Sequence, residues 1–191
     1  MNVINEYYIS GLDLSKLEKY ILQHGTKRTL RKKDYLVKQN ELNSCIGYIS
    51  KGMFRYTRID NWGNEHIVGY SLEKEFIGDY AANLCNKRAL VNIQAIVDSD
   101  VYIINYSEVI KLWNSSMEYQ ELGRLLAEQL FTMSYRRLID SYCCTPEERY
   151  TSLMKCYPNL KDLIPLKEIA SFIGVTPETL SNIRRRLLRK S

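Results

Sequence analysis

The stretch IASFIGVTPETLSNIRRRLLRKS, residues 169–191, holds the pattern that decides how the end of the sequence folds. Two helices that cross closely at a tight turn need a small residue in the first helix, a glycine in the turn and apolar residues at fixed offsets. Ala170 and Gly174 supply the small residue and the turn. The apolar offsets are met by Ile169, Ile173, Val175, Leu180 and Ile183. The sequence therefore predicts a helix-turn-helix unit that begins at Leu166.

The second of these helices has a favourable start and a polar outer face. Thr176 can cap it and Pro177 can occupy its first position. The first turns of a recognition helix approach base edges, so three polar residues there are expected to read bases: Glu178, Ser181 and Asn182. Six further residues are expected to contact phosphates: Lys167, Thr176, Thr179, Arg185, Arg186 and Arg189. For the arginines, a solvated helix face is the competing interpretation, and for Glu178 it is simple capping.

Charge is concentrated at the same end of the sequence. The formal net charge is +5. Between Leu166 and Ser191, six cations stand against Glu168 and Glu178, so most of the excess lies there. A localised positive charge is typical of a surface that binds a polyanion.

Earlier in the sequence, residues 26–106 consist of short apolar or alternating runs separated by turn signals. The runs MFRYTRI and EHIVGYS flank DNWGN, which is a strong hairpin signal. Many short strands at regular spacing predict a sandwich or barrel-like β domain. A helix is expected before it, over residues 12–24.

A long helix is predicted for residues 115–144, which contain no proline and a recurring apolar stripe. The stripe comprises Leu122, Leu126, Leu130 and Met133. Two interpretations stay open for it. The helix can pack on its own β domain, or it can pair with a second copy in a parallel coiled coil. We favour pairing, and different faces could serve both purposes.

A capping box opens the next helix, since Thr145 is followed by Pro146 and by Glu148 at the third helical position. This start marks a hinge between Cys144 and Thr145. Three segments are therefore expected: a β domain over residues 1–114, a dimerisation helix over 115–143 and a DNA-binding domain over 144–191. No β-hairpin wing is expected after the last helix of this domain.

Several functional classes receive no support from the sequence. It contains no signal peptide and no apolar run of the roughly 20 residues that span a bilayer, so no membrane association and a cytoplasmic location are expected. The five cysteines and two histidines fit no zinc or redox spacing, so no metal site is expected. No nucleophile motif or glycine-rich phosphate loop indicates an enzyme.

The chain resembles the Crp/Fnr family of bacterial transcription regulators over nearly its full length. SKGMFRYTRIDNWGNEHIVGYSLEKEFIGDY is similar to the β-roll hairpin of that family, and EIASFIGVTPETLSNI to its DNA-reading signature. The resemblance implies an α+β fold: a double-stranded β-helix (jelly-roll or β-roll) sensor domain, a long dimerisation helix and a C-terminal helix-turn-helix. It also implies a homodimer that binds double-stranded DNA, with RNA polymerase as a further partner. Members often have arginine at the positions of Pro177 and Asn182, so a different operator is expected.

The resemblance also locates an effector pocket, at Gly78, Asp79, Arg88, Ala89 and Leu90. Nucleotide-binding members use a Gly-Glu step and, about eleven residues later, an Arg-Ser pair. Here Asp79 replaces the glutamate, and Ala89 and Leu90 replace the pair, with Arg88 one residue early. Because a phosphate without its arginine loses a charge-assisted partner, we do not expect tight binding of cAMP. The effector is left open, and no cofactor is predicted.

The sequence thus predicts a sequence-specific DNA-binding transcription regulator that acts as a homodimer and carries a sensor domain. The alternative is a ligand-sensing or protein-interaction module whose helix-turn-helix does not read DNA.

Overall fold

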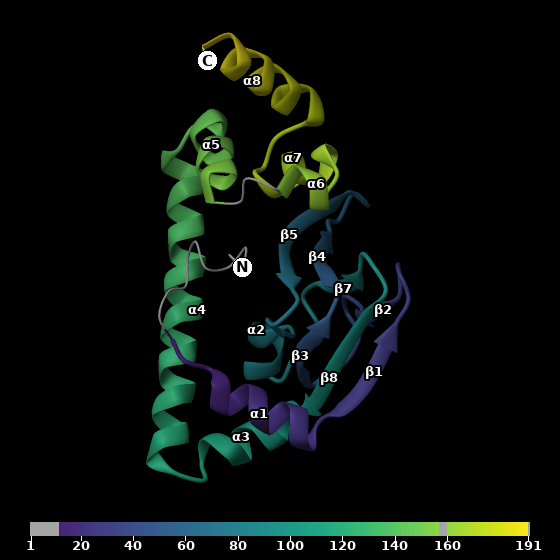
Figure 1. Ribbon diagram of the computed structural model, residues 1–191, viewed down its shortest axis with the longest axis vertical. Helices are drawn as coiled ribbons and strands as arrows, with labels where there is room; N and C mark the ends of the chain where they lie inside the picture. Colours follow the sequence, from purple (N-terminus) through teal and green to yellow (C-terminus); the bar gives the residue numbers. More distant parts are fainter. Residues whose placement is uncertain (1–11, 157–159, 191) are drawn as a thin grey trace. The chain divides into compact units, whose positions relative to one another are not determined.

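The computed structural model describes residues 12–156 and 160–190 (Figure 1). Contacts divide the chain within the long helix α4 (Met117–Cys143). The N-terminal unit consists of the described residues up to Leu130, and the C-terminal unit of those from Phe131 onward. No helix in the described ranges is long and apolar enough to cross a bilayer.

The N-terminal unit is built on two four-stranded antiparallel sheets. The first has the strand order β1-β8-β3-β6 and the second β2-β7-β4-β5. Its elements before α4 are α1 (Ser15–His24), β1 (Thr26–Leu30), β2 (Tyr35–Val37), β3 (Cys45–Lys51), β4 (Met53–Ile59), β5 (Glu65–Leu72), β6 (Phe76–Ile77), α2 (Tyr80–Leu84), β7 (Asn92–Ala95), β8 (Ser99–Asn105) and α3 (Tyr106–Trp113). This arrangement confirms the predicted α+β fold with an antiparallel β domain.

A buried apolar cluster joins the two sheets face to face. Ile49 and Val101 come from the first sheet, and Phe54 and Ile93 from the second; all four are fully buried. The facing sides of the two sheets are thus both apolar, which is the pattern of a β-sandwich.

The predicted hairpin is present as β4 and β5, paired from Met53–Leu72 to Ile59–Glu65. Asp60 organises its turn by accepting hydrogen bonds from the main-chain N–H groups of Trp62 and Asn64, each at 2.9 Å. A short polar side chain that bonds main chain further along is typical of such turns.

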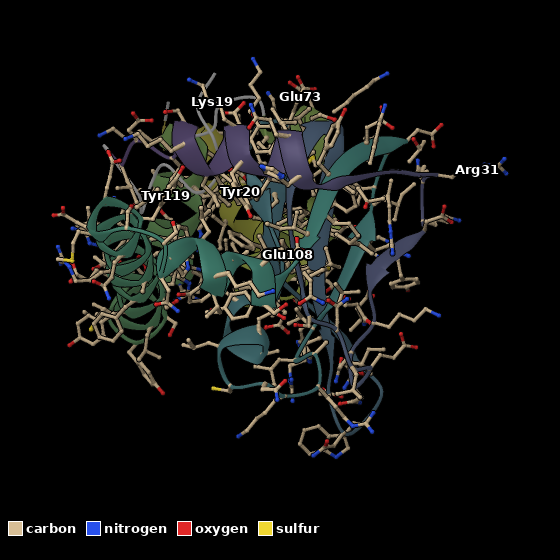
Figure 2. All side chains as sticks on the ribbon, turned by 90° about the horizontal axis from the view of Figure 1, so that it is seen from below. Lys19, Tyr20, Arg31, Glu73, Glu108 and Tyr119 are labelled. Carbon is tan, nitrogen blue, oxygen red and sulfur yellow. The ribbon has the colours of Figure 1, made fainter. Side chains whose placement is uncertain are left out.

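A second apolar cluster covers the outer side of the first sheet. Leu17 and Ile21 of α1 and Val109 of α3 are buried there with strand residues and with Leu122 from the beginning of α4. Figure 2 shows Tyr20 of α1 and Tyr119 of α4 beside this cluster, against which both are packed. The first half of α4 is thus part of the N-terminal unit.

Gly123 is required by this packing. A Cβ atom at this position would lie 3.0 Å from the ring of Trp113 in α3. The single glycine of the long helix therefore permits the close approach of α3 and α4.

The C-terminal unit contains the second half of α4 followed by α5 (Pro146–Cys156), α6 (Leu160–Leu163), α7 (Leu166–Phe172) and α8 (Pro177–Lys190). The predicted capping box opens α5: Thr145 N–H donates to the Glu148 carboxylate at 2.7 Å, and Glu148 N–H donates to the Thr145 hydroxyl at 3.3 Å. The long helix is slightly shorter than expected, and the short helices α2, α3 and α6 were not predicted. They are too short for their apolar period to stand out from a strand or a loop.

Candidate nucleic-acid interface and sensor site

Helices α7 and α8 form the predicted helix-turn-helix. Ile169, Ala170, Leu180 and Ile183 are buried between them, and Ala170 has no exposed surface. Gly174 has a φ of +73°, and a Cβ atom there would meet nothing within 4 Å, so only the backbone conformation requires glycine. The turn is closed by the main-chain N–H of residue 175, which donates to the Ala170 carbonyl at 2.9 Å.

Thr176 is the N-cap of α8, as the sequence predicts. Its hydroxyl accepts a hydrogen bond from the Thr179 main-chain N–H at 3.2 Å and lies 3.1 Å from the Thr179 hydroxyl. Hydrogen bonds from its own main-chain N–H and from Thr176 lower the pKa of Glu178 below its ordinary value of 4.5. Thr176 therefore has a structural task besides the predicted phosphate contact, and Glu178 presents a carboxylate at neutral pH.

The three predicted base-reading residues share the outer face of α8. Glu178, Ser181 and Asn182 are all exposed. The Asn182 carbonyl oxygen lies 3.4 Å from a guanidinium nitrogen of Arg185, one turn later. This contact can fix the orientation of the Asn182 amide, whose two ends must face the two partners of an adenine edge.

The predicted phosphate contacts lie at the surface of the same unit. Lys167, Thr179, Arg185, Arg186 and Arg189 are exposed. Arg186 also forms an ion pair with Glu147 of α5, at 3.2 Å. A phosphate would have to compete with this carboxylate for Arg186, whereas Arg185 and Arg189 have no acidic partner within the described residues.

Arg149 of α5 is a functional candidate that the sequence did not reveal. Its guanidinium donates to the carbonyl of Cys144 at 2.6 Å, just after α4, and to that of Ile173 at 3.0 Å, the C-cap of α7. One cation thus serves the carbonyl ends of two helices, where a positive charge is favourable. The Arg149–Ile173 bond joins residues 24 positions apart, so no local sequence pattern indicates it.

A second arginine joins the same elements. The Arg137 guanidinium of α4 lies 4.7 Å from the ring centre of Phe172, at the end of α7. This is a cation–π distance. Together, Arg137 and Arg149 tie α7 to the end of α4.

The predicted dimerisation stripe divides between two roles. Leu122 is 8% exposed within the N-terminal core, and Leu126 packs against the same cluster. Leu130 and Met133 are half-buried. For Leu122 and Leu126 the structure therefore realises the alternative of packing on the chain's own β domain.

A different apolar row lies exposed on the second half of α4. It comprises Phe131, Tyr135, Leu138 and Tyr142, each of them at least half exposed. The rings of Phe131 and Tyr135 are stacked with their centres 6.0 Å apart. Intervals of four, three and four residues are those of a coiled-coil seam.

The predicted effector residues lie near one another, and the polar side chains of Asp79 and Arg88 bond to the protein's own main chain. Asp79 is 9% exposed and caps α2: its carboxylate accepts from the Ala82 N–H at 3.1 Å and from the Leu90 N–H at 2.6 Å. Ala89 is buried, whereas Leu90 is exposed. Arg88 extends outward and donates to the Asn40 carbonyl at 2.8 Å.

Tyr56 closes the inner side of this segment. Its hydroxyl lies 3.1 Å from the Ser71 hydroxyl and accepts a weak hydrogen bond from the Gly78 N–H at 3.4 Å. Burial raises the pKa of Tyr56 to about 12, so it stays protonated at neutral pH.

A separate basic groove lies between β1 and β2. It has a volume of about 510 Å³, and Arg28, Lys33, Tyr35 and Lys38 are among its lining residues. None of the predicted effector residues lines it. Arg31, close to this groove in sequence, extends into solvent (Figure 2). The net charge of the sequence hides this basic run, because acidic residues elsewhere in the β domain offset it.

Comparison with known proteins agrees with this architecture. Residues 27–116 match the family described as cyclic nucleotide-binding domain. No curated protein matches the chain in sequence.

Solved structures are similar over most of the chain. FixK2 from Bradyrhizobium japonicum is 16% identical, with 87% of this chain and 85% of that one covered and a TM-score of 0.71. CLP, the c-di-GMP responsive global regulator of Xanthomonas campestris, is 16% identical, with 93% of each chain covered and a TM-score of 0.66. The catabolite activator protein of Thermus thermophilus is 17% identical, with 96% and 87% covered and a TM-score of 0.55. Residues 27–116 thus match the cyclic nucleotide-binding domain family, and the chain has the fold of the Crp/Fnr regulators over most of its length, which confirms the resemblance seen in its sequence.

Proposed function

We propose that this chain is a sequence-specific DNA-binding transcription regulator that works as a homodimer. The observation that carries the proposal is the α7–α8 pair. Its apolar side chains are buried around Ala170 and the Gly174 turn, which leaves Glu178, Ser181 and Asn182 together on an exposed helix face. A helix with this exposed polar start can enter a major groove and contact base edges.

The cations of the C-terminal unit supply the affinity that does not depend on sequence. Arg185, Arg189 and Lys167 are exposed and available for phosphates. Neutralising phosphates releases counterions, so binding weakens steeply as salt increases. Asn182 and Glu178 are proposed to select the bases, since an amide can pair with adenine and a carboxylate can accept from cytosine.

The homodimer is proposed to form through the exposed seam of α4. Phe131, Tyr135, Leu138 and Tyr142 have the spacing of a coiled coil and are not covered by the C-terminal unit. Two copies joined there would place two recognition helices on a pseudo-palindromic site, about 34 Å apart. We also propose the domain limits expected from the sequence: a β-sheet sensor over residues 1–114, the pairing helix over 115–143 and the DNA-binding domain over 144–191.

Sedimentation can test the dimer directly. We expect the wild-type chain to sediment as a dimer at micromolar concentration and a Phe131→Asp, Leu138→Asp double variant to sediment as a monomer. A Leu188→Asp variant is the control, because Leu188 is also a strongly exposed apolar residue but lies on α8. A monomeric wild type would contradict the seam.

DNA selection tests the function itself. Genomic fragments that bind the purified protein should share a motif with two related halves, and a gel shift should show them preferred over random DNA. The affinity should fall as salt increases. Binding without sequence preference would favour the alternative of a sensing or interaction module.

CLP and the catabolite activator protein are named as regulators, and we propose no catalytic role for this chain. RNA polymerase remains a proposed partner.

A further inference from the structure

We propose that Asp79 acts as a built-in anionic ligand, which holds the residue 79–90 segment of the sensor domain closed without an external effector. The regulatory consequence, DNA binding that is independent of cyclic nucleotides, depends on the proposed DNA-binding function. The occupancy of the site by Asp79 does not.

Both carboxylate oxygens of Asp79 are engaged by main-chain donors. One oxygen accepts from the Ala82 N–H at 3.1 Å, inside α2, and the other from the Leu90 N–H at 2.6 Å, in a segment eleven residues later. The second distance is short for an N–H donor, as expected when the acceptor is a carboxylate. Asp79 therefore joins the two ends of this segment, and its low exposure of 9% keeps the bond away from water.

The far end of the segment is fixed by a neighbouring loop. The Ala89 N–H donates to the Glu41 carbonyl at 2.9 Å, and the Asn40 N–H donates to the Ala89 carbonyl at 2.8 Å. These bonds present the Leu90 N–H to Asp79 in a defined position. The segment is thus held by main-chain hydrogen bonds to residues 40 and 41 as well as by Asp79.

Two arginines that could have attracted an anion are used for the protein's own carbonyls. Arg88 donates to the Asn40 carbonyl at 2.8 Å, and Arg58 donates to the Leu90 carbonyl at 2.6 Å. Both contacts reinforce the closed segment from outside. Both arginines are thus bonded to main-chain carbonyls, and Asp79 to main-chain N–H groups.

An external phosphate would meet two obstacles here. The Leu90 N–H already has an anionic acceptor, and the Asp79 carboxylate would repel a second negative charge in a poorly solvated position. Cyclic nucleotides carry a phosphate anion, so their binding would require that Asp79 first be displaced. The donor that would receive the ligand is occupied by the chain itself.

Calorimetry tests the occupied site in the wild type. We expect no binding of cAMP, cGMP or c-di-GMP at millimolar concentration, and an unchanged gel shift on a selected DNA site when they are added. Micromolar binding of any of the three would overturn the proposal. If the protein selects no DNA, the proposed function fails, but the binding and melting measurements still test Asp79.

Chemical rescue tests whether the carboxylate acts as a ligand. Asp79→Ala is expected to lower the melting temperature by roughly 5 °C and to weaken operator binding. Sodium formate should restore part of both losses, relative to sodium chloride at equal ionic strength. Asp98→Ala is the matched control, because Asp98 also accepts a main-chain N–H, from Lys32 at 2.8 Å, but at an exposed position. Equal responses of the two variants to formate would overturn the proposal.

A conservative variant separates charge from hydrogen bonding and covers the case in which Asp79→Ala does not fold. In Asp79→Asn the side chain can still cap α2 but carries no charge. We expect Asp79→Asn to fold and to melt below the wild type, without restoration by formate, because its side chain fills the site. A wild-type melting temperature in this variant would show that the anion has no role.

Discussion

Two carboxylates at helix starts behave in opposite ways in this molecule. Glu178 lies in the first turn of α8 and is exposed, whereas Asp79 caps α2 and is buried. Both are favoured by the positive end of a helix. The difference lies in burial: Asp79 is buried and bonded to main-chain N–H groups, whereas Glu178, although it accepts hydrogen bonds from its own N–H and from Thr176, is exposed and can meet a partner. The outer face of α8 is thus open, and the residue 79–90 segment is closed by the chain's own hydrogen bonds.

The largest effect is expected when the buried side of α8, which holds its exposed face in place, loses an apolar side chain. Ile183 lies on the buried side of α8 and is 1% exposed, and Ile183→Ala should lower the free energy of unfolding by about 2–5 kcal/mol. Denaturant unfolding followed by circular dichroism measures the loss, and DNA binding should disappear with it. Leu188→Ala, at 77% exposed on the same helix, should change stability by less than about 0.5 kcal/mol. Similar losses in both variants would contradict the assigned faces of α8.

The next test removes the link between the open face and α4. Arg149→Ala leaves the carbonyls of Cys144 and Ile173 without their donor, and bonds from a charged group are worth about 1.5–3 kcal/mol. We expect operator affinity to fall by about tenfold or more, on the same scale of energy. Arg149→Lys should recover only part of it, because an ammonium lacks the planar fork. Full affinity in Arg149→Ala would remove its positioning role.

The comparison is sharpened by testing the open face for selectivity. Asn182→Ala should reduce the preference for the selected site over random DNA by about 1–3 kcal/mol, with little change in nonspecific affinity. Competition gel shifts measure both quantities. Arg189→Ala is the control, since a phosphate contact should weaken binding to all sequences alike. An unchanged preference in Asn182→Ala would exclude it as a base reader.

A smaller effect is expected from the cap of α8. Thr176→Ala removes the acceptor of the Thr179 N–H and should cost about 1 kcal/mol of stability. Thr176→Ser keeps the hydroxyl and should match the wild type. Thermal unfolding distinguishes the two variants. If Thr176→Ala melts like wild type but binds DNA weakly, the phosphate contact is its main role instead.

The smallest effect is expected for the pH dependence of stability, through Glu148 in the capping box of α5. Main-chain and hydroxyl hydrogen bonds from Thr145 lower the pKa of Glu148 below 4.5. A carboxyl whose pKa is lowered by folding stabilises the fold above its unfolded pKa, and this contribution is lost as the pH falls through the folded value. The stability difference between wild type and Glu148→Gln should therefore shrink below about pH 4.5. A difference that is constant from pH 6 to pH 3 would contradict the charged capping box.

The helix-turn-helix could be predicted almost completely from the sequence. The features that define it are local in sequence. The apolar offsets from Ile169 to Ile183 follow from the helical period, and the turn requires a positive φ, which favours glycine at position 174. The hairpin of β4 and β5 is equally local, because the turn sequence sets the pairing. Burial of the predicted core residues shows that such short-range patterns are sufficient there.

The roles of the long helix could not be predicted in the same way. Its apolar residues lie on more than one face, and periodicity alone does not say which face meets which partner. Leu122 enters the N-terminal core, while Phe131 and Tyr135 stay exposed only half a helix later. The bonds of Asp79 to Leu90 and of Arg149 to Ile173 depend on tertiary placement, so no sequence spacing indicates them.

The contacts between α4 and α7 determine where the chain can be joined to that of a relative in a chimeric protein. A chimera joined at the capping box of α5 would take Arg137 from one parent and Phe172 from the other, and Arg149 would face a foreign Cys144 position. A junction near Leu130 keeps these partners together in one parent, at the point where the chain divides into its two units. Exchange of the C-terminal unit between relatives is therefore expected to succeed with a junction in the middle of the long helix rather than at its end.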